Sequence, residues 1–398
     1  MIALVVAALY TSTAQVESIA AAGATLWAAT GGGVEEYSLP DGTRRRLYTT
    51  QDGLDSNHVR KVSFDGVLHA RTESCECTLR ETRFLCLPAP LLPEAVPAVS
   101  RRWHGERETD RLNVGPQTIV ATAGGLFLGE RRITPPGQIC GNHIEALAEF
   151  RGELWAGAFD GGVCVRRGGA WHPVRAPFRM VNDLRATPRG LYAAAAEGLF
   201  VSRDGRRFRR EARVRERGAN RLASSKRWLF VTTPSVLYAI GLDRDIVRRW
   251  RHPAGSTALQ SVTVSRGEVW LASEDRGVIR KRGGKFESFD RASGLPSSWT
   301  VDVAPARQGG VWAASLRDGA FRLSRGGSVR ESSADPNAWG LRLYDDGGRM
   351  LFGTQQGLQG ARTPALPDPH VHALLRTREA LWIGTEGGLL SVDEPAQL

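Results

Sequence analysis

The sequence predicts an all-β fold, on three observations. A short apolar phrase built around Leu-Trp recurs about ten times along the 398 residues, at intervals of roughly 40 residues, the length of one propeller blade. Gly-rich turns separate short runs of alternating apolar and polar residues. Gly or Pro interrupts every stretch that could show the apolar period of a helix. Together these features predict a β-propeller of four-stranded antiparallel blades.

The repeated phrase accounts for the strands of each blade. An apolar strand comes first, and a polar turn, the Leu-Trp strand, a Gly-rich turn and further strands follow. Clear copies are LWAATGGGVEEY from Leu26, LWAGAFDGGVCV from Leu154, VWLASEDRGVIR from Val269 and LWIGTEGGLL from Leu381, and weaker ones begin at Val67, Ile119 and Leu229. One blade cannot bury both of its faces, so neighbouring blades must stack. We expect the repeated tryptophans to pack between blades, namely Trp27, Trp155, Trp270, Trp312 and Trp382.

The number of copies exceeds the four to eight blades typical of this fold. The repeat count favours a single ring of nine or ten blades over residues 15–398. The alternative is a seven-blade ring from about His143 onward with a three-blade part before it. That arrangement is disfavoured, because three blades alone cannot close and leave sheet edges exposed.

The first fourteen residues form a separate feature. The apolar run Met1–Leu9, followed by Ser12, Thr13 and Ala14, predicts a signal peptide over 1–14, although a basic start is missing. The alternative is a strand that closes the propeller ring. No segment reaches eighteen apolar residues, so no membrane span is expected. We therefore expect a soluble periplasmic or extracellular protein of bacterial type.

Two connections and the last repeat carry a family resemblance. The connections are DGLDSN over 52–57 and SGLPSS over 293–298, and the repeat is LWIGTEGGL from Leu381. These motifs resemble the two-component-regulator propeller repeat. The resemblance implies a ligand-binding propeller like the periplasmic sensor part of membrane histidine kinases, or a stand-alone secreted relative. Because kinase and DNA-binding parts are lacking, no signalling output is inferred, and the family offers no fixed catalytic residues.

The five cysteines fit an exported protein. If the turn at Glu81-Thr82 has two residues, Cys77 lies opposite Cys86, where a cross-strand disulfide is possible. Cys140 and Cys164 are a second candidate pair, which leaves Cys75 unpaired. The alternative is five reduced, buried thiols. A zinc site formed by His69 with Cys75, Cys77 and Cys86 lacks a standard spacing and is not expected.

Catalytic motifs do not stand out. There is no HExxH, no phosphate loop with Lys and no GxSxG elbow, so we expect a non-catalytic protein without cofactor or metal. His370 and His372 could share one strand face, but a structural or solvent-exposed role is favoured. The alternative function is a propeller enzyme, a lyase or glycan hydrolase. It would need histidines and acids converging at the mouth of the axial channel.

Charge sorted by turn predicts a two-faced disc. The net charge is +11, but no Lys/Arg-dense block interleaved with aromatic residues is apparent, so nucleic acid is not an expected partner. Turns on one face carry arginines that could bind a protein or an anionic envelope partner: Arg151, Arg166, Arg167, Arg189, Arg227, Arg266, Arg282, Arg307, Arg325, Arg349, Arg376 and Arg378. Turns on the other face carry Asp160, Glu197, Glu274, Asp275, Asp318 and Glu386. The alternative is ordinary solvated loops. The leading hypothesis is an exported sensor or binding module for a partner or small-molecule ligand.

Overall fold

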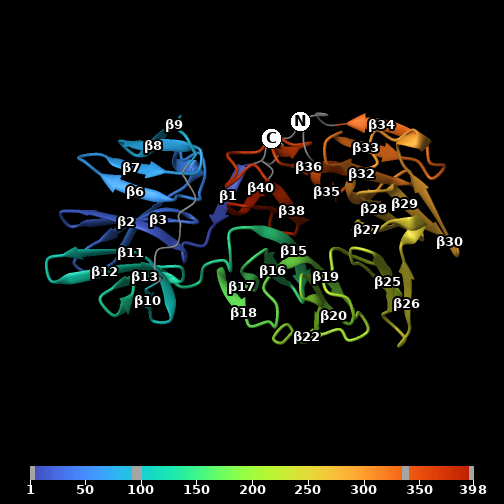
Figure 1. Cartoon of the computed structure of the whole chain (residues 1–398), viewed down its shortest axis with the longest axis horizontal. Coiled ribbons are helices and arrows are strands. Elements are labelled where there is room, and N and C mark those ends of the chain that lie inside the picture. The colour runs from blue at the N-terminus through green and yellow to red at the C-terminus, as the bar shows by residue number, and fades with distance from the viewer. Residues whose placement is uncertain (1–4, 92–100, 334–339, 394–398) are drawn as a thin grey trace.

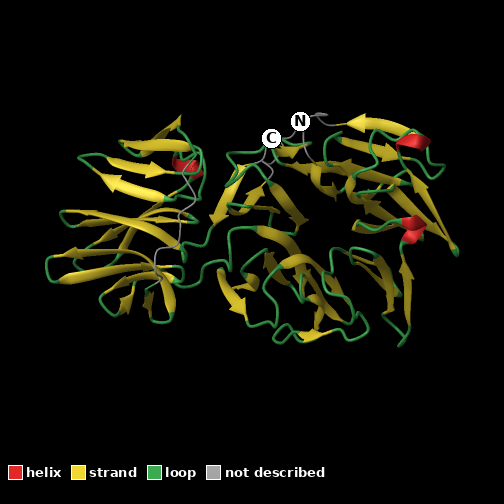
Figure 2. Cartoon of the chain, viewed as in Figure 1, coloured by secondary structure: helices red, strands yellow, loops and turns green. Residues whose placement is uncertain are grey.

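The computed structural model describes residues 5–91, 101–333 and 340–393. These residues form forty strands in ten antiparallel sheets, with three single-turn 3-10 helices and no α-helix in the described part (Figure 2). The predicted all-β fold is confirmed. None of the described helices has the length and apolar character needed to cross a membrane.

Three sheets from the first part of the chain form one stack, which we call the three-sheet stack. Strand β2 contacts both β6 and β11, so its sheet lies in the middle (Figure 1). The strands are β2 (Val16–Ala22), β3 (Thr25–Thr30), β4 (Gly33–Ser38) and β5 (Arg44–Tyr48); β6 (Lys61–Phe64), β7 (Leu68–Arg71), β8 (Cys75–Arg80) and β9 (Arg83–Pro88); and β10 (Arg102–Trp103), β11 (Glu106–Val114), β12 (Gln117–Thr122), β13 (Gly125–Leu128) and β14 (Arg131–Arg132).

The other seven sheets form a second body, the seven-sheet cycle. Its strands are β15 (Ile144–Phe150), β16 (Glu153–Ala158), β17 (Gly162–Arg167), β18 (Ala170–Val174), β19 (Val181–Thr187), β20 (Gly190–Ala195), β21 (Gly198–Ser202), β22 (Arg209–Arg210), β23 (Leu222–Ser224), β24 (Trp228–Thr232), β25 (Val236–Gly241), β26 (Val247–Arg251), β27 (Leu259–Ser265), β28 (Glu268–Ser273), β29 (Gly277–Arg282), β30 (Lys285–Phe289), β31 (Thr300–Pro305), β32 (Val311–Ser315), β33 (Ala320–Leu323), β34 (Val329–Ser333), β35 (Gly340–Asp346), β36 (Arg349–Thr354), β37 (Gly357–Gln359), β38 (Val371–Arg376), β39 (Leu381–Thr385), β40 (Gly388–Asp393) and β1 (Val5–Tyr10). The 3-10 turns are η1 (Thr50–Asp52), η2 (Pro253–Gly255) and η3 (Arg291–Ser293).

The inner strands of the seven sheets are β15, β19, β23, β27, β31, β35 and β38. Contacts between these inner strands run around the cycle and return to its start. Each of β15, β19, β23, β27, β31 and β35 contacts the inner strand of the next sheet, and β38 contacts β15. The expected single ring of nine or ten blades is therefore wrong for this structure. Because β15 packs directly on β38, no place between them remains for the three-sheet stack, which lies beside the cycle (Figure 1).

Aromatic side chains fill the spaces between sheets, as the repeat predicts. Trp155 is buried with Leu191 and Phe208 of the next sheet, and Trp270 is buried with Val311 and residues around it. Each fully buried large side chain contributes roughly 1.5–3 kcal/mol or somewhat more by apolar area. Packing of this kind explains why the repeated residues carry the fold.

Strand β1 completes the last sheet of the cycle. It pairs antiparallel with β40, with Tyr10 opposite Leu389. The Tyr10 ring lies 5.7 Å from that of Trp382 and 6.0 Å from that of Trp171. This is the arrangement expected of a ring-closing strand, the alternative to a signal peptide. Cleavage after residue 14 stays a prediction.

The DGLDSN connection begins at Asp52, the last residue of η1, and forms the turn after it. The side chains and backbone of Thr49 and Asp52 cap each other, and Gly53 has a φ of 96°, a left-handed conformation that glycine adopts without strain. Asp290, Ser293 and Gly294 repeat the same geometry around η3. The family-like motif is thus a structural turn.

Candidate functional site

The inner strands of the seven-sheet cycle begin at one end of its axis, which we call the mouth, and strand pairing there is irregular. Register shifts leave one residue unpaired near the start of β15, β19, β31, β35 and β38, and two near the start of β27. A bulge re-aims the extra side chain away from the sheet face. The single bulge residues are Glu145, Asn182, Val301, Leu341 and His372.

These bulge residues surround one hollow of about 280 Å³ at the cycle axis. Asn220, Arg221 and Gln260 complete its lining. Val301 and Leu341 make one side apolar, whereas the rest presents charged and amide groups. An apolar wall with a few convergent polar groups is the usual character of a small-molecule site.

Two histidines and two glutamates form a continuous network at this mouth. His143 Nε2 lies 2.9 Å from Glu145 Oε1, and His372 Nδ1 lies 3.3 Å from the same oxygen. His372 Nε2 lies 3.0 Å from Glu386 Oε1. The rings of the two histidines are 4.7 Å apart. Histidines and acids therefore converge where the enzyme alternative required them.

The network keeps its carboxylates ionised. Burial would raise the pKa of Glu145, but its hydrogen bond with His143 and the charge of His372 lower the pKa to about 2. The hydrogen bond with His372 lowers the pKa of Glu386 below its usual value. Burial would lower the pKa of His143, but the hydrogen bond and charge of Glu145 outweigh burial and raise it. Glu145 thus carries its negative charge at neutral pH.

His370 belongs to a neighbouring cluster. Its Nδ1 lies 2.8 Å from Asp368 Oδ1, and its ring lies 6.5 Å from that of His372, with the two planes nearly parallel. The two histidines do lie close together. Both have acidic partners, so the expected plain structural or solvent-exposed role does not describe them fully.

Two aspartates beneath the mouth hold adjacent inner strands together. Asp183 Oδ2 accepts the backbone N–H of Leu222 at 2.8 Å, and Asp302 Oδ2 accepts that of Leu343 at 2.8 Å. The Arg342 guanidinium lies 3.5 Å from Asp183 Oδ1. Charge-assisted bonds from a buried carboxylate to backbone amides are strong and directional. They fix the strands that present the bulge residues.

A second hollow of about 290 Å³ separates the seven-sheet cycle from the three-sheet stack. Ser12, His58 and Asn142 line it, together with His143 and Glu386 of the network. The axial mouth therefore adjoins the cleft between the two bodies through these two network residues.

Many of the arginines predicted for a basic face are paired with carboxylates of the same face, which lies at the opposite end of the inner strands from the mouth. The pairs are Arg166 with Glu379, Arg167 with Glu153, Arg227 with Asp243, Arg282 and Arg325 with Glu268, and Arg349 and Arg376 with Asp346. Arg151, Arg266 and Arg307 donate to backbone carbonyls of neighbouring turns. Arg378 and Glu379 both line a hollow between the sheet of β15 to β18 and the sheet of β38 to β40. Many of these ion pairs and hydrogen bonds therefore link neighbouring sheets.

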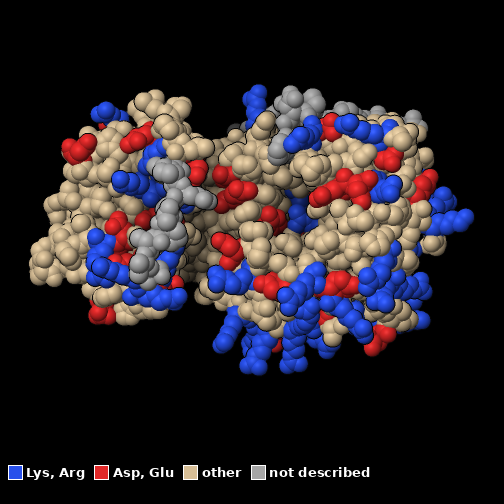
Figure 3. All heavy atoms as spheres, in the orientation of Figure 1, with Lys and Arg blue, Asp and Glu red and all other residues tan. Residues whose placement is uncertain are grey.

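Positive charge without an ion pair gathers on this same face, around the sheet that contains β21 and β22. Arg189, Arg203, Arg206, Arg207 and Arg209 line one hollow, and none of them has an ion pair in the described part of the chain. We call these five residues the arginine cluster. Lys and Arg project along the lower edge of the right-hand body, near β18 to β22 (Figure 3). The expectation that no Arg-dense block exists overlooked residues 203–217, where Phe208 stands among eight arginines.

Residues predicted for the acidic face have mixed roles. Glu386 lies in the network at the mouth, whereas Glu274 accepts a hydrogen bond from Gln260. Asp275 accepts hydrogen bonds from Ser256 and Thr257. Some carboxylates of the predicted acidic face therefore accept hydrogen bonds from nearby side chains.

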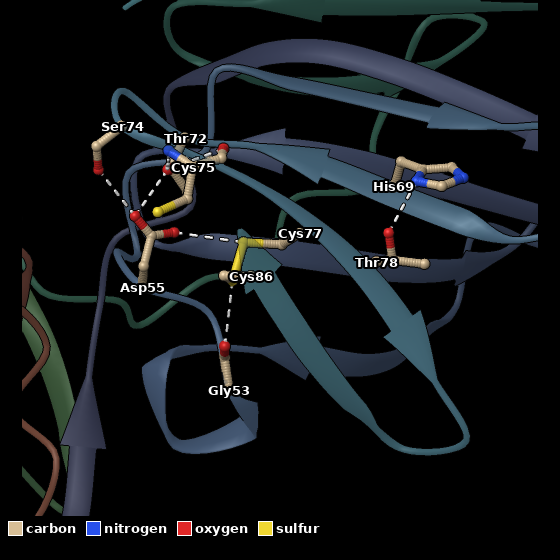
Figure 4. The surroundings of a disulfide bond; sticks show 9 residues. All are labelled: Gly53, Asp55, His69, Thr72, Ser74, Cys75, Cys77, Thr78 and Cys86. Atoms are coloured by element: carbon tan, nitrogen blue, oxygen red, sulfur yellow. Dashed lines mark hydrogen bonds between the residues drawn. A yellow bond between two sulfur atoms is a disulfide. The ribbon is translucent and has the colours of Figure 1, made fainter. Parts of the chain in front are cut away.

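None of the described cysteines lines the axial hollow, but Cys140 lines the second hollow beside His143. Cys77 is joined to Cys86 on β8 and β9, Cys140 is joined to Cys164, and Cys75 is a free thiol. His69 accepts or donates a hydrogen bond with Thr78 at 3.1 Å and points away from the sulfur atoms (Figure 4). The four residues weighed for zinc therefore do not face one common point.

The four-stranded antiparallel sheets, stacked around an axis, define a protein of β-propeller architecture. No family model and no curated protein sequence matches the chain. Among solved structures it is similar to the extracellular domains of two hybrid two-component system proteins from B. thetaiotaomicron. The first, BT4673, is 11% identical, with a TM-score of 0.53 over 96% of this chain and 69% of that one. The second, BT3049, is 13% identical, with a TM-score of 0.57 over 94% of this chain and 60% of that one.

An enzyme shares the architecture as well. A streptogramin B lyase structure is 12% identical, with a TM-score of 0.53 over 65% of this chain and 95% of that one. At these identities the similarity shows the fold alone. The two-component-system neighbours and the lyase thus share the β-propeller architecture with this chain.

Sequence reasoning missed most of the mouth. His372 and Glu386 were noted singly, whereas Glu145, Asn182 and Arg221 were not noted at all. Glu145, Asn182, Arg221 and His372 share one signal, a position at the start of an inner strand, whereas Glu386 lies in the turn between β39 and β40. That signal becomes visible only when the seven repeats are aligned by strand.

Proposed function

We propose that the chain is an exported, ligand-binding propeller of the sensor type, and that its ligand binds in the hollow at the axial mouth. The observation that carries the proposal is the arrangement of the bulge residues, which places one side chain from each of several sheets around a single hollow. The polar and apolar sides suit a small molecule with hydrogen-bonding groups on one side and an apolar surface on the other.

A pocket-blocking variant tests this proposal. Leu341→Trp places a large ring in the hollow without removing a charge, and Leu91→Trp is the matched control on an exposed position. Thermal shift is measured with neutral disaccharides, acidic disaccharides and dipeptides as probes. We expect at least one probe class to raise the Tm of the wild type and of the control but not of Leu341→Trp. A shift retained in Leu341→Trp would place binding elsewhere.

The network favours a second candidate, acid–base catalysis on a ligand held at the same mouth. His372 stands between two carboxylates, with 13% of its side chain exposed, and a positioned histidine is the commonest general acid or base. The neighbouring acids would orient it. Turnover of a bound probe that is lost in His372→Ala but kept in His172→Ala would support this candidate over binding alone.

The arginine cluster supports a further part of the proposal, an anionic or protein partner. These residues lie on the sheet of β19 to β22 and its turns, whereas many of the other predicted arginines are paired. Unpaired guanidinium groups attract anions, and salt weakens that attraction. Export through a signal peptide over 1–14 belongs to the same proposal, although cleavage would remove β1 and leave β40 without its outer neighbour.

A further inference from the structure

The geometry points to a transition-metal site formed by His143, Glu145 and His372, with Zn²⁺ as the ion that fits best. One ligand atom of each residue lies within 4.8 Å of the others. Two imidazoles and one carboxylate form a donor set that Zn²⁺ accepts readily. The inference concerns the same mouth as the proposed function, but it names a ligand of different chemistry.

The distances suit one small ion. Zn–N and Zn–O bonds of about 2.0–2.2 Å in a tetrahedron place donor atoms roughly 3.3 Å apart. Glu145 Oε1 lies 2.9 Å from His143 Nε2 and 3.3 Å from His372 Nδ1. Two of the three donor separations therefore lie close to the spacing that one ion requires.

Rigid elements hold the three donors. Glu145 and His372 are bulge residues on the adjacent inner strands β15 and β38. His143 directly precedes β15, and its ring stacks on Phe159 with centroids 5.0 Å apart. Sites built on strands keep their geometry better than sites on loops.

The surrounding residues resemble the outer shell of a metal site. If His372 Nδ1 binds the ion, its Nε2–H donates to Glu386 Oε1 at 3.0 Å, the carboxylate–histidine arrangement that orients metal-binding imidazoles. Arg221 lies 3.8 Å from Glu145 Oε2, which leaves Oε1 directed at the two histidines. Three protein ligands leave a fourth position open toward the hollow, as in zinc sites that bind a water or a substrate.

Metal titration of the full chain tests the site. After dialysis against a chelator, Zn²⁺ binding is measured by calorimetry in a Cys75→Ser background, which removes the free thiol as a ligand. We expect one Zn²⁺ per chain. His143→Ala and His372→Ala should each weaken binding at least 100-fold, and Glu386→Gln by about 10–100-fold, the usual effect of an outer-shell change. His172→Ala, an exposed histidine, should bind as the parent does.

Co²⁺ provides a second measurement. The strong visible absorption of four-coordinate Co²⁺ should appear in the parent and in His172→Ala, and it should be absent in His143→Ala. Thermal unfolding of the metal-free variants shows whether they remain folded, and Glu145→Gln repeats the test with a conservative change. Failure of the parent to bind one ion, or equal binding by His143→Ala, would overturn the inference. Probe binding in the thermal-shift experiment would be unaffected by that failure, so the two proposals are separable.

Discussion

The side-chain amide of Asn57 in the three-sheet stack donates to the backbone carbonyl of Gly387 in the seven-sheet cycle, at 3.1 Å. Asn57 is fully buried, and its Oδ1 accepts the backbone N–H of Thr50 at 2.8 Å. One residue of the DGLDSN turn therefore both closes the turn and joins the two bodies.

Asn57→Ala should weaken this attachment. Losing one partner of a buried hydrogen bond costs about 1–3 kcal/mol. In calorimetry we expect the stack to unfold at a lower temperature than the cycle, and limited proteolysis to cut between them sooner. Asn113→Ala, at an exposed position of the same stack, is the control. A single unchanged transition in Asn57→Ala would show that other contacts hold the bodies together.

Cys75 should be the only titratable thiol of the native protein. Burial, together with the hydrogen bond and charge of Asp55, raises the pKa of Cys75, so little thiolate forms at neutral pH. We expect slow alkylation at pH 7.5 that accelerates above pH 9, and no reaction in Cys75→Ser. Three or five thiols, counted in denaturant without reductant, would mean that the disulfides do not form in solution.

The arginine cluster should dominate binding to a polyanion. Replacement of Arg206, Arg207 and Arg209 by Ala should lower the salt concentration that elutes the protein from a heparin column. Replacement of Arg166, Arg167 and Arg376 removes the same charge from residues that are ion-paired, so a smaller shift is expected. Equal shifts would indicate that net charge alone governs binding.

Asp346 should make stability depend on pH. Burial would raise its pKa, but hydrogen bonds from Arg376 and Arg349 lower it below the usual value. A folded-state pKa below the unfolded value of about 3.9 stabilises the protein above that value, and the contribution is lost as pH falls through the folded-state pKa. Asp346→Asn should therefore lower the free energy of unfolding at pH 7 by about 1–3 kcal/mol, and the Tm with it.

The difference in Tm between Asp346→Asn and the wild type should shrink from about pH 5 downward, as the wild-type carboxyl takes up its proton. Asp243→Asn removes a carboxylate from an exposed pair with Arg227 and should change Tm little at any pH. A constant difference between Asp346→Asn and the wild type across this range would contradict the assignment.

The first residue of the exported protein distinguishes the two roles of the N-terminal segment. A chain beginning at Gln15, found by N-terminal sequencing, matches the predicted signal peptide. Retention of Val5–Tyr10 matches the strand that pairs with β40. In the second case, Tyr10→Ala should lower Tm, because the Tyr10 ring packs against Trp382 and Trp171.

The fold class was predictable because the signals that carry it are local. Leu-Trp strands and Gly turns recur within each repeat, and the opposition of Cys77 and Cys86 follows from one turn. The division into a stack and a cycle depends on β15 packing against β38, strands far apart in the chain. The sequence of neither β15 nor β38 indicates that the two strands are in contact.

The candidate site was predictable only in part. His372 and Glu386 attract attention as residue types, but Glu145 and Asn182 gain their roles from bulges that turn them toward the axis. Ion pairs with Glu268 and Asp346 neutralise part of the predicted basic face, and these partners come from other sheets, so the sequence order does not show them.

The pairing of β1 with β40 also determines when the molecule can finish folding. Tyr10 opposes Leu389, so the last sheet depends on two strands that are far apart in the sequence. Contacts of such long sequence separation form slowly. The last sheet stays incomplete until β1 pairs with β40, and until then its edge is open to any other strand that reaches it.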